Sequence, residues 1–144
     1  MTRADDIERI VIAAHTLTRI AALSTQNDAP SAQWHALSLL QQQGPLRVGD
    51  LARLARTTQP GMTRLVGQLV EQSLVTRTPD PDDSRATVVT LTDAGSEALA
   101  AWKTQLGTAL APLFADLTDA EWAALEHASR ILTDRAAAVP AATR

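Results

Sequence analysis

A group of arginines in the middle of this 144-residue sequence is the set of side chains best suited to chemistry. Between Leu46 and Arg77 the sequence carries five bases and two acids, a net charge of +3, whereas the remaining residues carry 8 bases and 14 acids. The five bases are Arg47, Arg53, Arg56, Arg64 and Arg77. Because a guanidinium group binds phosphate oxygens and guanine edges, this basic segment of an acidic chain predicts an anion-binding surface. On charge alone, an ordinary solvated helical face is the more common explanation.

Most other chemistries lack their residues in this sequence. There is no cysteine, which excludes disulfides, cysteine-ligated zinc, iron–sulfur clusters and thiol redox switches. The three histidines, His15, His35 and His127, fall on different predicted helices and lack metal-ligand spacing. Neither a nucleophile–base motif nor a phosphate-binding loop is present. We therefore expect no metal, no cofactor and no enzymatic activity.

Composition and hydropathy predict a cytoplasmic protein with a single domain over residues 1–144. The hydrophobic fraction of 45% and the charged fraction of 20% are typical of globular proteins. No apolar run approaches the ~20 residues of a membrane-spanning helix, so we expect no membrane partner. The first eight residues are polar and include acids, which is unlike a signal or transit peptide.

Hydrophobic periodicity predicts the helices that must position the arginines. The first helix, Ala4–Ser24, has apolar residues on two faces, so we expect a partner subunit to cover one of them. A second helix follows Ser31 and ends at Gly44-Pro45, and a short third helix covers Val48–Leu54. The fourth helix covers residues 58–71 with Thr58 as its N-cap. Two more helices begin at Thr92 and at Thr118, where Glu121 completes a capping box.

The segment between the fourth and fifth helices predicts a β-hairpin, which we call the wing. Leu74–Thr78 and Ala86–Thr92 are rich in valine and threonine with near-alternating polarity, and the turn formers Pro79–Ser84 separate them. The third and fourth helices, joined by a tight break, predict a helix-turn-helix. A helix-turn-helix followed by a hairpin is a winged helix-turn-helix.

In such a fold the fourth helix fits the major groove of DNA and presents the side chains of its first turns. Gln59 can pair with adenine, Arg64 with guanine, and Thr63 with a base or a phosphate. Arg47, Arg53 and Arg56 are expected nearer the phosphate backbone. Thr58 and Arg77 complete the expected DNA-binding residues of the helix-turn-helix and the wing strand.

Residues 73–95, SLVTRTPDPDDSRATVVTLTDAG, closely resemble the wing of the MarR family (multiple antibiotic resistance regulators). That wing reads approximately G-L-V-x-R-x-x-D-P-x-D-x-R-x-x-x-V-x-L-T-x-x-G. Further matches lie upstream, at Ala32-Gln33-Trp34, Leu37, Leu51-Ala52, Thr63-Arg64-Leu65 and Leu69. The resemblance covers nearly the whole chain. It implies a mainly α fold with a small β-hairpin wing and a winged helix-turn-helix lobe at about 31–92.

The resemblance also implies a function. Helices at about 4–24 and 93–138 would form a homodimer, and each subunit would read half of a pseudo-palindromic operator. Arg85 matches the wing arginine that enters the minor groove, and Asp83 matches the acid that orders the wing, often by pairing with that arginine. Two positions depart from the family pattern. Ser73 and Arg56 stand where glycine is usual, so Ser73 requires either a left-handed backbone or a different cap, and Arg56 gains access to phosphate.

The family's ligand response gives a further expectation, because members often hold small aromatic or anionic ligands above the DNA-binding lobe. Here His15 and Arg19 of the first helix and Trp34 and His35 of the second are the candidates. The chain is thus expected to be a ligand-responsive transcriptional regulator and a repressor. The alternative is a winged-helix protein-interaction module that has lost DNA binding, which Arg64 and Arg85 argue against.

Overall fold

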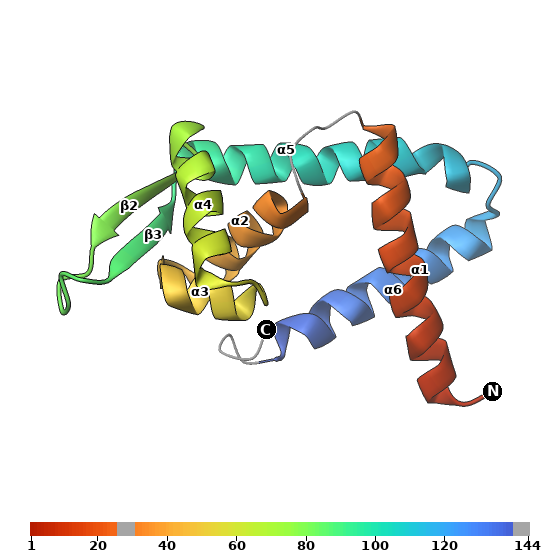
Figure 1. The fold of residues 1–144 in the computed structure, drawn as a ribbon. Coiled ribbons are helices and arrows are strands. Elements are labelled where there is room, and N and C mark those ends of the chain that lie inside the picture. Colours follow the sequence, from red (N-terminus) through yellow and green to blue (C-terminus); the bar gives the residue numbers. More distant parts are fainter. Residues whose placement is uncertain (26–30, 140–144) are drawn as a thin grey trace.

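The computed structural model describes residues 1–25 and 31–139, and it is mainly helical with one small sheet (Figure 1). This confirms the fold class expected from the sequence. In chain order the elements are α1 (Arg3–Ser24), α2 (Ser31–Gln43), β1 (Leu46–Arg47), α3 (Val48–Leu54), α4 (Gln59–Glu71), β2 (Val75–Pro79), β3 (Thr87–Leu91), α5 (Asp93–Leu110), the 3-10 turn η1 (Ala111–Phe114) and α6 (Asp119–Ala137).

Side-chain caps fix where three of the predicted helices begin. The Thr58 hydroxyl oxygen accepts a hydrogen bond from the Gly61 N–H at 3.1 Å, and the Thr92 hydroxyl oxygen accepts one from the Gly95 N–H at 3.0 Å. At the start of α6, Thr118 and Glu121 form both bonds of a capping box. The start sites predicted at Thr58, Thr92 and Thr118 are therefore confirmed. Each cap satisfies backbone donors that the first helical turn leaves unpaired.

The sheet contains a strand that the sequence did not reveal. The strand order of the sheet is β1-β3-β2, and both pairings are antiparallel. Val89 of β3 lies opposite Leu46 of β1 on one side and Arg77 of β2 on the other. The predicted hairpin is present, although its strands cover Val75–Pro79 and Thr87–Leu91. Strand β1 has only two residues, too few to show alternating polarity. It nevertheless ties the start of α3 to the base of the wing.

One hydrophobic core holds α2, α3, α4 and the base of the wing together. Its buried members are Ala36, Leu37, Leu39, Leu40, Val48, Leu51, Ala52, Met62, Val66, Leu69, Val75, Val89 and Leu99. Only Leu99 comes from α5, near the beginning of that helix. The rest of α5 extends away from the wing toward α1 at the opposite end of the molecule (Figure 1). The DNA-binding residues expected from the sequence therefore sit on one packed unit.

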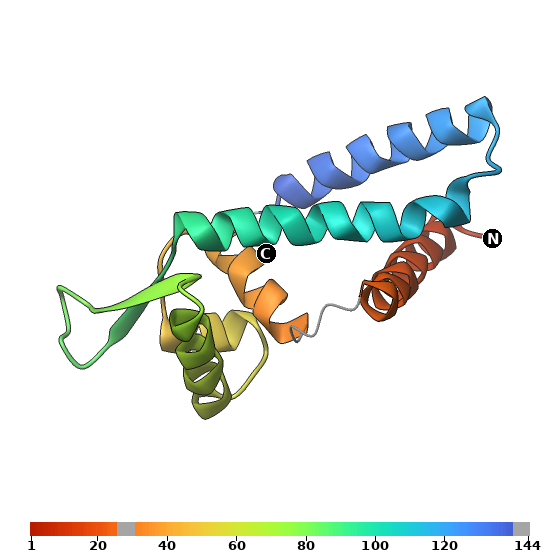
Figure 2. The same cartoon turned by 90° about the horizontal axis from the view of Figure 1, so that it is seen from above.

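The two terminal helices bury little in the single chain. Helix α1 buries only Ala21, and α6 buries no residue at all. Figure 2 shows α1 and α6 on opposite sides of α5. Large apolar side chains are exposed on both, namely Ile7, Ile10, Val11, Ile12, Ile20 and Leu23 on α1, and Trp122, Leu125, Ile131 and Leu132 on α6. Within the described residues no helix is both long and apolar enough to span a membrane.

Candidate nucleic-acid interface

Helix α4 turns one face into the core and presents the other to solvent. Its buried residues, Met62, Val66 and Leu69, recur at the spacing of a single helical face. Gln59, Thr63 and Arg64 therefore lie on the exposed part of the first two turns. The Thr58 cap and a proline at the N-terminal end fix the start of this helix. The polar residues predicted to face DNA are thus held on a rigid helix.

Residues of β1, α3, α4, β2, β3 and the wing turn line a hollow of about 350 Å³ beside α4, which we call the wing-side hollow. It lies between α3, the exposed flank of α4 and the wing. Its lining residues are Arg47, Val48, Gly49, Asp50, Gln59, Thr63, Val66, Arg77, Arg85, Ala86 and Thr87. Five of the residues predicted from the sequence are therefore brought together: Arg47, Gln59, Thr63, Arg77 and Arg85. Three of these are cations.

The hydrogen bonds around α4 decide which groups remain available to a ligand. The Thr63 hydroxyl donates to the Gln59 carbonyl oxygen at 2.9 Å, so its proton is used inside the helix and its oxygen can accept. The Thr58 hydroxyl oxygen is occupied by the capping bond. The Gln59 side-chain amide makes no hydrogen bond within the described part of the chain and offers both donors and an acceptor. Gln59 is consequently the most versatile hydrogen-bonding group in the wing-side hollow.

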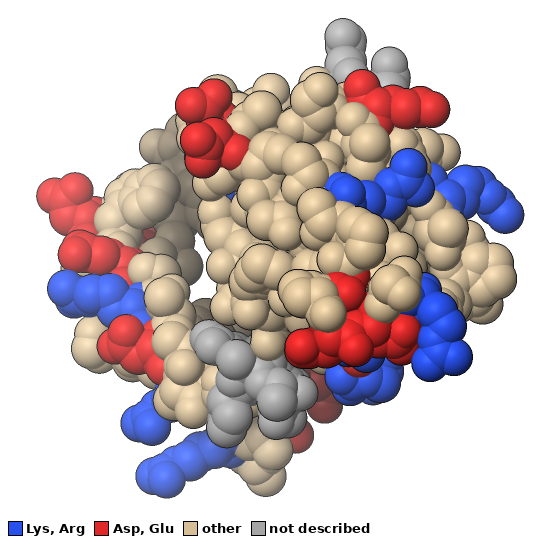
Figure 3. All heavy atoms as spheres, turned by 90° about the vertical axis from the view of Figure 1, so that its left-hand side faces the viewer, with Lys and Arg blue, Asp and Glu red and all other residues tan. Residues whose placement is uncertain are grey.

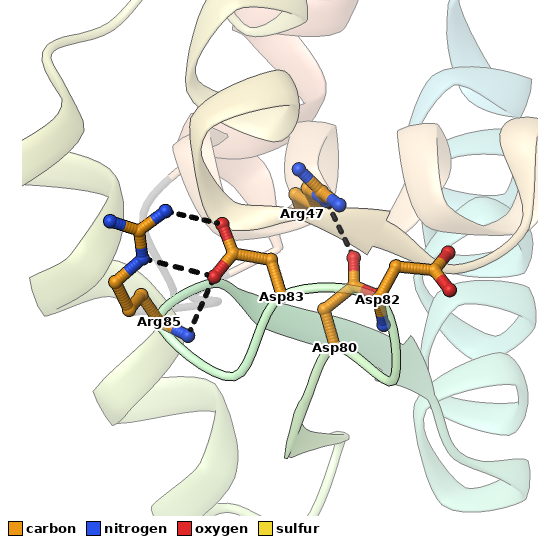
Figure 4. A network of polar contacts seen from close by, with 5 residues as sticks. All are labelled: Arg47, Asp80, Asp82, Asp83 and Arg85. Atoms are coloured by element: carbon orange, nitrogen blue, oxygen red, sulfur yellow. Dashed lines mark hydrogen bonds and ion pairs between the residues drawn. The ribbon is translucent and has the colours of Figure 1, made fainter.

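The wing carries Arg85 on an ordered turn (Figure 4). Asp83 Oδ1 accepts from the Arg85 backbone N–H and from Arg85 Nε, both at 3.1 Å. These two hydrogen bonds, the one from the guanidinium first, hold the pKa of Asp83 below its ordinary value. The Arg85 side chain is still 90% exposed. Asp83 thus orients the guanidinium group without enclosing it.

A second ion pair joins the wing to the helix-turn-helix, and it was not predicted from the sequence. Arg47 Nε of β1 lies 2.6 Å from Asp80 Oδ2. Asp80 Oδ1 accepts the Asp82 backbone N–H at 2.8 Å, and this bond, followed by the Arg47 pair, lowers the pKa of Asp80. The carboxylate conversely raises the pKa of Arg47. The resemblance includes an aspartate at this position, but nothing in the sequence identifies its partner 33 residues earlier.

Of the predicted arginines outside the wing-side hollow, Arg64 lies on another side of α4. Arg64 lines a different hollow of about 470 Å³, the α2-side hollow, together with His35 of α2 and Leu65 and Gln68 of α4. Arg53 lies 3.8 Å from Asp50 one turn away. Among the described residues, no carboxylate oxygen lies within 4 Å of Arg56, Arg64 or Arg77. The predicted set is thus divided over two sides of α4.

Both positions that depart from the family pattern adopt left-handed backbone conformations. Arg56 has φ 55° and Ser73 has φ 62°. Of the two possibilities at Ser73, the left-handed backbone is the one that occurs. A side chain is unfavourable in this region because Cβ approaches the following carbonyl oxygen, which is why glycine is preferred. Arg56 therefore projects a cation from a turn where glycine would present none.

Of the four ligand-pocket candidates, only His35 lines either of the two hollows beside α4. Trp34 stacks on Trp102 of α5, with ring centroids 5.2 Å apart and an angle of 11° between the planes. His35 borders the α2-side hollow, whereas His15 and Arg19 are exposed on α1. No group of three or more histidine and acidic side chains suited to a metal ion occurs within residues 1–25 and 31–139.

The surface on the wing side of the molecule is mixed in charge. Figure 3 shows an acidic cluster bordered by basic side chains rather than a uniformly basic face. Two of the arginines named above, Arg47 and Arg85, are paired with acids of the wing turn. The segment charge of +3 therefore overstates the positive field at this surface. Individual exposed arginines, rather than a broad basic patch, are the groups that can meet phosphates.

Comparison with known proteins gives consistent matches. Residues 30–87 match the MarR family. The chain is 31% identical over 100 residues to an uncharacterized HTH-type transcriptional regulator, Mb0904, of Mycobacterium bovis, covering 69% of this chain and 70% of that protein. A probable transcriptional regulator from Pseudomonas aeruginosa is 32% identical, with a TM-score of 0.56 and coverage of 90% and 99%. The apo form of MarR from E. coli shares the fold at 23% identity, with a TM-score of 0.70 and coverage of 87% and 93%.

Proposed function

This chain belongs to the MarR family of DNA-binding transcriptional regulators, which are not enzymes, and we propose that it acts as a homodimer on a pseudo-palindromic DNA operator. The wing-side hollow is the observation that carries the proposal. It combines the N-terminal turns of an exposed helix with a wing arginine, which are the parts that read adjacent grooves.

Each part of the surface has a separate role in the proposed complex. Helix α4 enters the major groove, which is ~12 Å wide, and Gln59, Thr63 and Arg64 contact base edges. Arg85 reaches the adjacent minor groove from the wing. Arg53, Arg56, Thr58 and Arg77 are the other proposed phosphate contacts, whereas Arg47, also expected near the phosphates, is paired with Asp80. Such contacts add affinity that falls with salt, whereas the base contacts supply sequence preference.

The exposed apolar residues of α1 and α6 support the homodimer. Side chains such as Val11, which is 61% exposed, and Trp122 cost free energy in water that a second copy would recover. A dimer places two copies of α4 on one face, and their separation must match half-sites about 34 Å apart. The terminal helices 4–24 and 93–138 are therefore the proposed dimerisation elements around the lobe 31–92.

We also propose that the protein is a repressor released by a small aromatic or anionic ligand. His15, Arg19, Trp34 and His35 are the candidate ligand contacts, gathered between the lobes by dimerisation. The ligand would have to favour the dimer geometry whose α4 separation mismatches the operator, since it shifts an equilibrium only by its differential affinity for the two states.

Arg85→Ala tests DNA binding directly, with Arg130→Ala as a matched control. Arg130 is an exposed arginine of α6 paired with Glu126, at 3.6 Å, and belongs to none of the DNA-facing elements. Because α6 is a proposed dimerisation helix, light scattering must first show that Arg130→Ala has the same mass as the unaltered protein. Fluorescence anisotropy on DNA from upstream of the gene should show a loss of about tenfold or more for Arg85→Ala and no loss for Arg130→Ala. The salt dependence of log K should also weaken only in Arg85→Ala.

Two outcomes would contradict the proposal. Equal affinities for the two variants would remove Arg85 from the interface. If the unaltered protein bound no DNA even at low salt, the protein-interaction module would be the better explanation of this winged helix. Titration of small aromatic carboxylates against the preformed DNA complex tests the proposed ligand response. A complex that none of these carboxylates dissociates would contradict the proposed release by ligand.

A further inference from the structure

Asp80 occupies a position different from the other acids of the wing turn. Its carboxylate is divided between two partners, with Oδ2 facing Arg47 Nε and Oδ1 accepting the Asp82 N–H. Its own backbone N–H donates to the Ala86 carbonyl oxygen at 2.9 Å and closes the turn. Only 10% of its side chain is exposed. One residue therefore connects the turn to itself and to β1.

Arg47 is equally well anchored at the other end of this pair. Its backbone lies in β1, opposite Val88 of β3, and the next residue begins α3. The side chain crosses from this strand to the wing turn, as Figure 4 shows. The ion pair thus spans two elements that are separated by 33 positions in the sequence. The Asp83–Arg85 and Arg53–Asp50 pairs each stay within one local segment.

We propose that Arg47 and Asp80 form a latch that fixes the direction of the wing relative to α4. In this arrangement Arg47 is a positioning residue, and it contributes to DNA binding through the placement of Arg85 rather than through a phosphate contact. The inference rests on the proposed function, since it concerns how the same surface is aimed. A hairpin attached only at its base pivots easily, and the latch restricts that movement near its tip.

The latch and simple electrostatics give opposite expectations for Asp80. Removing a negative charge beside a DNA-binding surface should increase affinity, because the carboxylate repels phosphates. If the carboxylate holds the wing, its removal should lower affinity instead. Asp82 provides the matched control, because it is an exposed acid of the same turn and its side chain makes no ion pair among the described residues.

The experiment compares Asp80→Asn, Asp82→Asn and Arg47→Gln in operator-binding assays over a range of salt concentrations. We expect Asp80→Asn and Arg47→Gln to lose about fivefold or more in affinity, and the double variant to lose no more than either. Asp82→Asn should bind equally or more tightly. Arg47→Gln should leave the slope of log K against log salt unchanged, whereas Arg77→Ala should reduce its magnitude by about 1.

A second arm links the latch to Arg85. In an Arg85→Ala background, Asp80→Asn should cause no further loss of affinity, because the side chain that the latch aims is absent. None of these residues belongs to the hydrophobic core, so circular dichroism should show folded variants. Arg47→Lys serves as a further variant if one of these proteins does not fold. Because lysine keeps the positive charge facing Asp80, Arg47→Lys should retain more DNA affinity than Arg47→Gln.

The outcomes distinguish a failure of the latch from a failure of the proposed DNA-binding function. If Asp80→Asn tightens DNA binding, the latch is wrong. If Arg47→Gln reduces the salt slope, the latch is also wrong and Arg47 is a phosphate contact. DNA binding by the unaltered protein would stand in either case. Failure of the unaltered protein to bind DNA would instead overturn the proposed function itself.

Discussion

Ser73→Gly should stabilise the protein, because Ser73 follows α4 in a left-handed conformation with φ 62°. The backbone N–H of Ser73 donates to the Val70 carbonyl oxygen, and its carbonyl oxygen accepts the Thr92 hydroxyl at 2.7 Å. Glycine keeps both of these bonds. No hydrogen bond to the Ser73 hydroxyl is present among the described residues. The substitution therefore removes steric strain and loses no interaction.

The size of the effect follows from two opposing terms. A non-glycine residue in the left-handed region costs about 1–2 kcal/mol. Glycine at the same place loses about 0.4–1 kcal/mol because the unfolded chain becomes more flexible. The expected net gain in the free energy of unfolding is thus about 0.5–1 kcal/mol, which corresponds to a rise in Tm of about 2–4 °C for a chain of this size.

Urea denaturation followed by circular dichroism measures this gain, and two neighbouring substitutions control for it. Gln72→Gly changes the preceding residue, whose φ is −83°, and should lower stability by up to about 1 kcal/mol. Ser73→Ala removes the hydroxyl but keeps Cβ, so it should change little. If Ser73→Gly destabilised the protein as Gln72→Gly does, the strain argument would be refuted.

Arg56→Gly should give a similar gain in stability, because Arg56 also has a left-handed backbone with φ 55°, but it should lower DNA affinity because a cation is lost. Thermal melting and fluorescence anisotropy on the same sample measure the two effects. Gly95→Ala should lose about 3 kcal/mol or more in a urea titration, because the new Cβ would collide with the Leu74 carbonyl oxygen. Val11→Asp should turn the proposed dimer into a monomer in light scattering, and an unchanged dimer mass would place the interface elsewhere. Asp80 has a depressed pKa, so its contribution to stability is complete above pH ~4 and is lost as pH falls through the lowered value. Denaturation between pH 2 and 6 should therefore show a smaller acid loss in Asp80→Asn than in the unaltered protein.

Much of the local structure could be predicted from the sequence because short-range signals specify it. Thr58, Thr92 and Thr118 begin helices since their hydroxyls satisfy backbone donors three residues later. The run of turn formers after Pro79 marks the hairpin in the same way. Strand β1 lacks any such signal, because two residues become a strand only when β3 lies beside them.

The candidate site was predicted in part. The exposure of the polar residues on α4 followed from the position of this helix in a helix-turn-helix, and the Asp83–Arg85 arrangement followed from the family resemblance. The DNA-facing role of α4 stays a prediction. The direction of Arg64 did not follow, because one helical position changes the azimuth by 100° and moves a side chain from the wing-side hollow to the α2-side hollow. The proximity of His15 and Arg19 to Trp34 was an expectation about tertiary packing and stays a prediction; Trp34 stacks on Trp102 of α5, and His35 borders the α2-side hollow.

The sequence by itself determined the helix starts, the hairpin and the family, since each depends on residues that are neighbours along the chain. The tertiary structure alone decided that Asp80 of the wing turn pairs with Arg47 of β1. Asp80, Asp82 and Asp83 carry the same side chain in one turn, yet Asp80 pairs with Arg47, Asp83 pairs with Arg85 and Asp82 remains exposed. The reason is physical: Coulomb attraction and hydrogen bonding act over a few ångströms, and only the folded turn sets those distances.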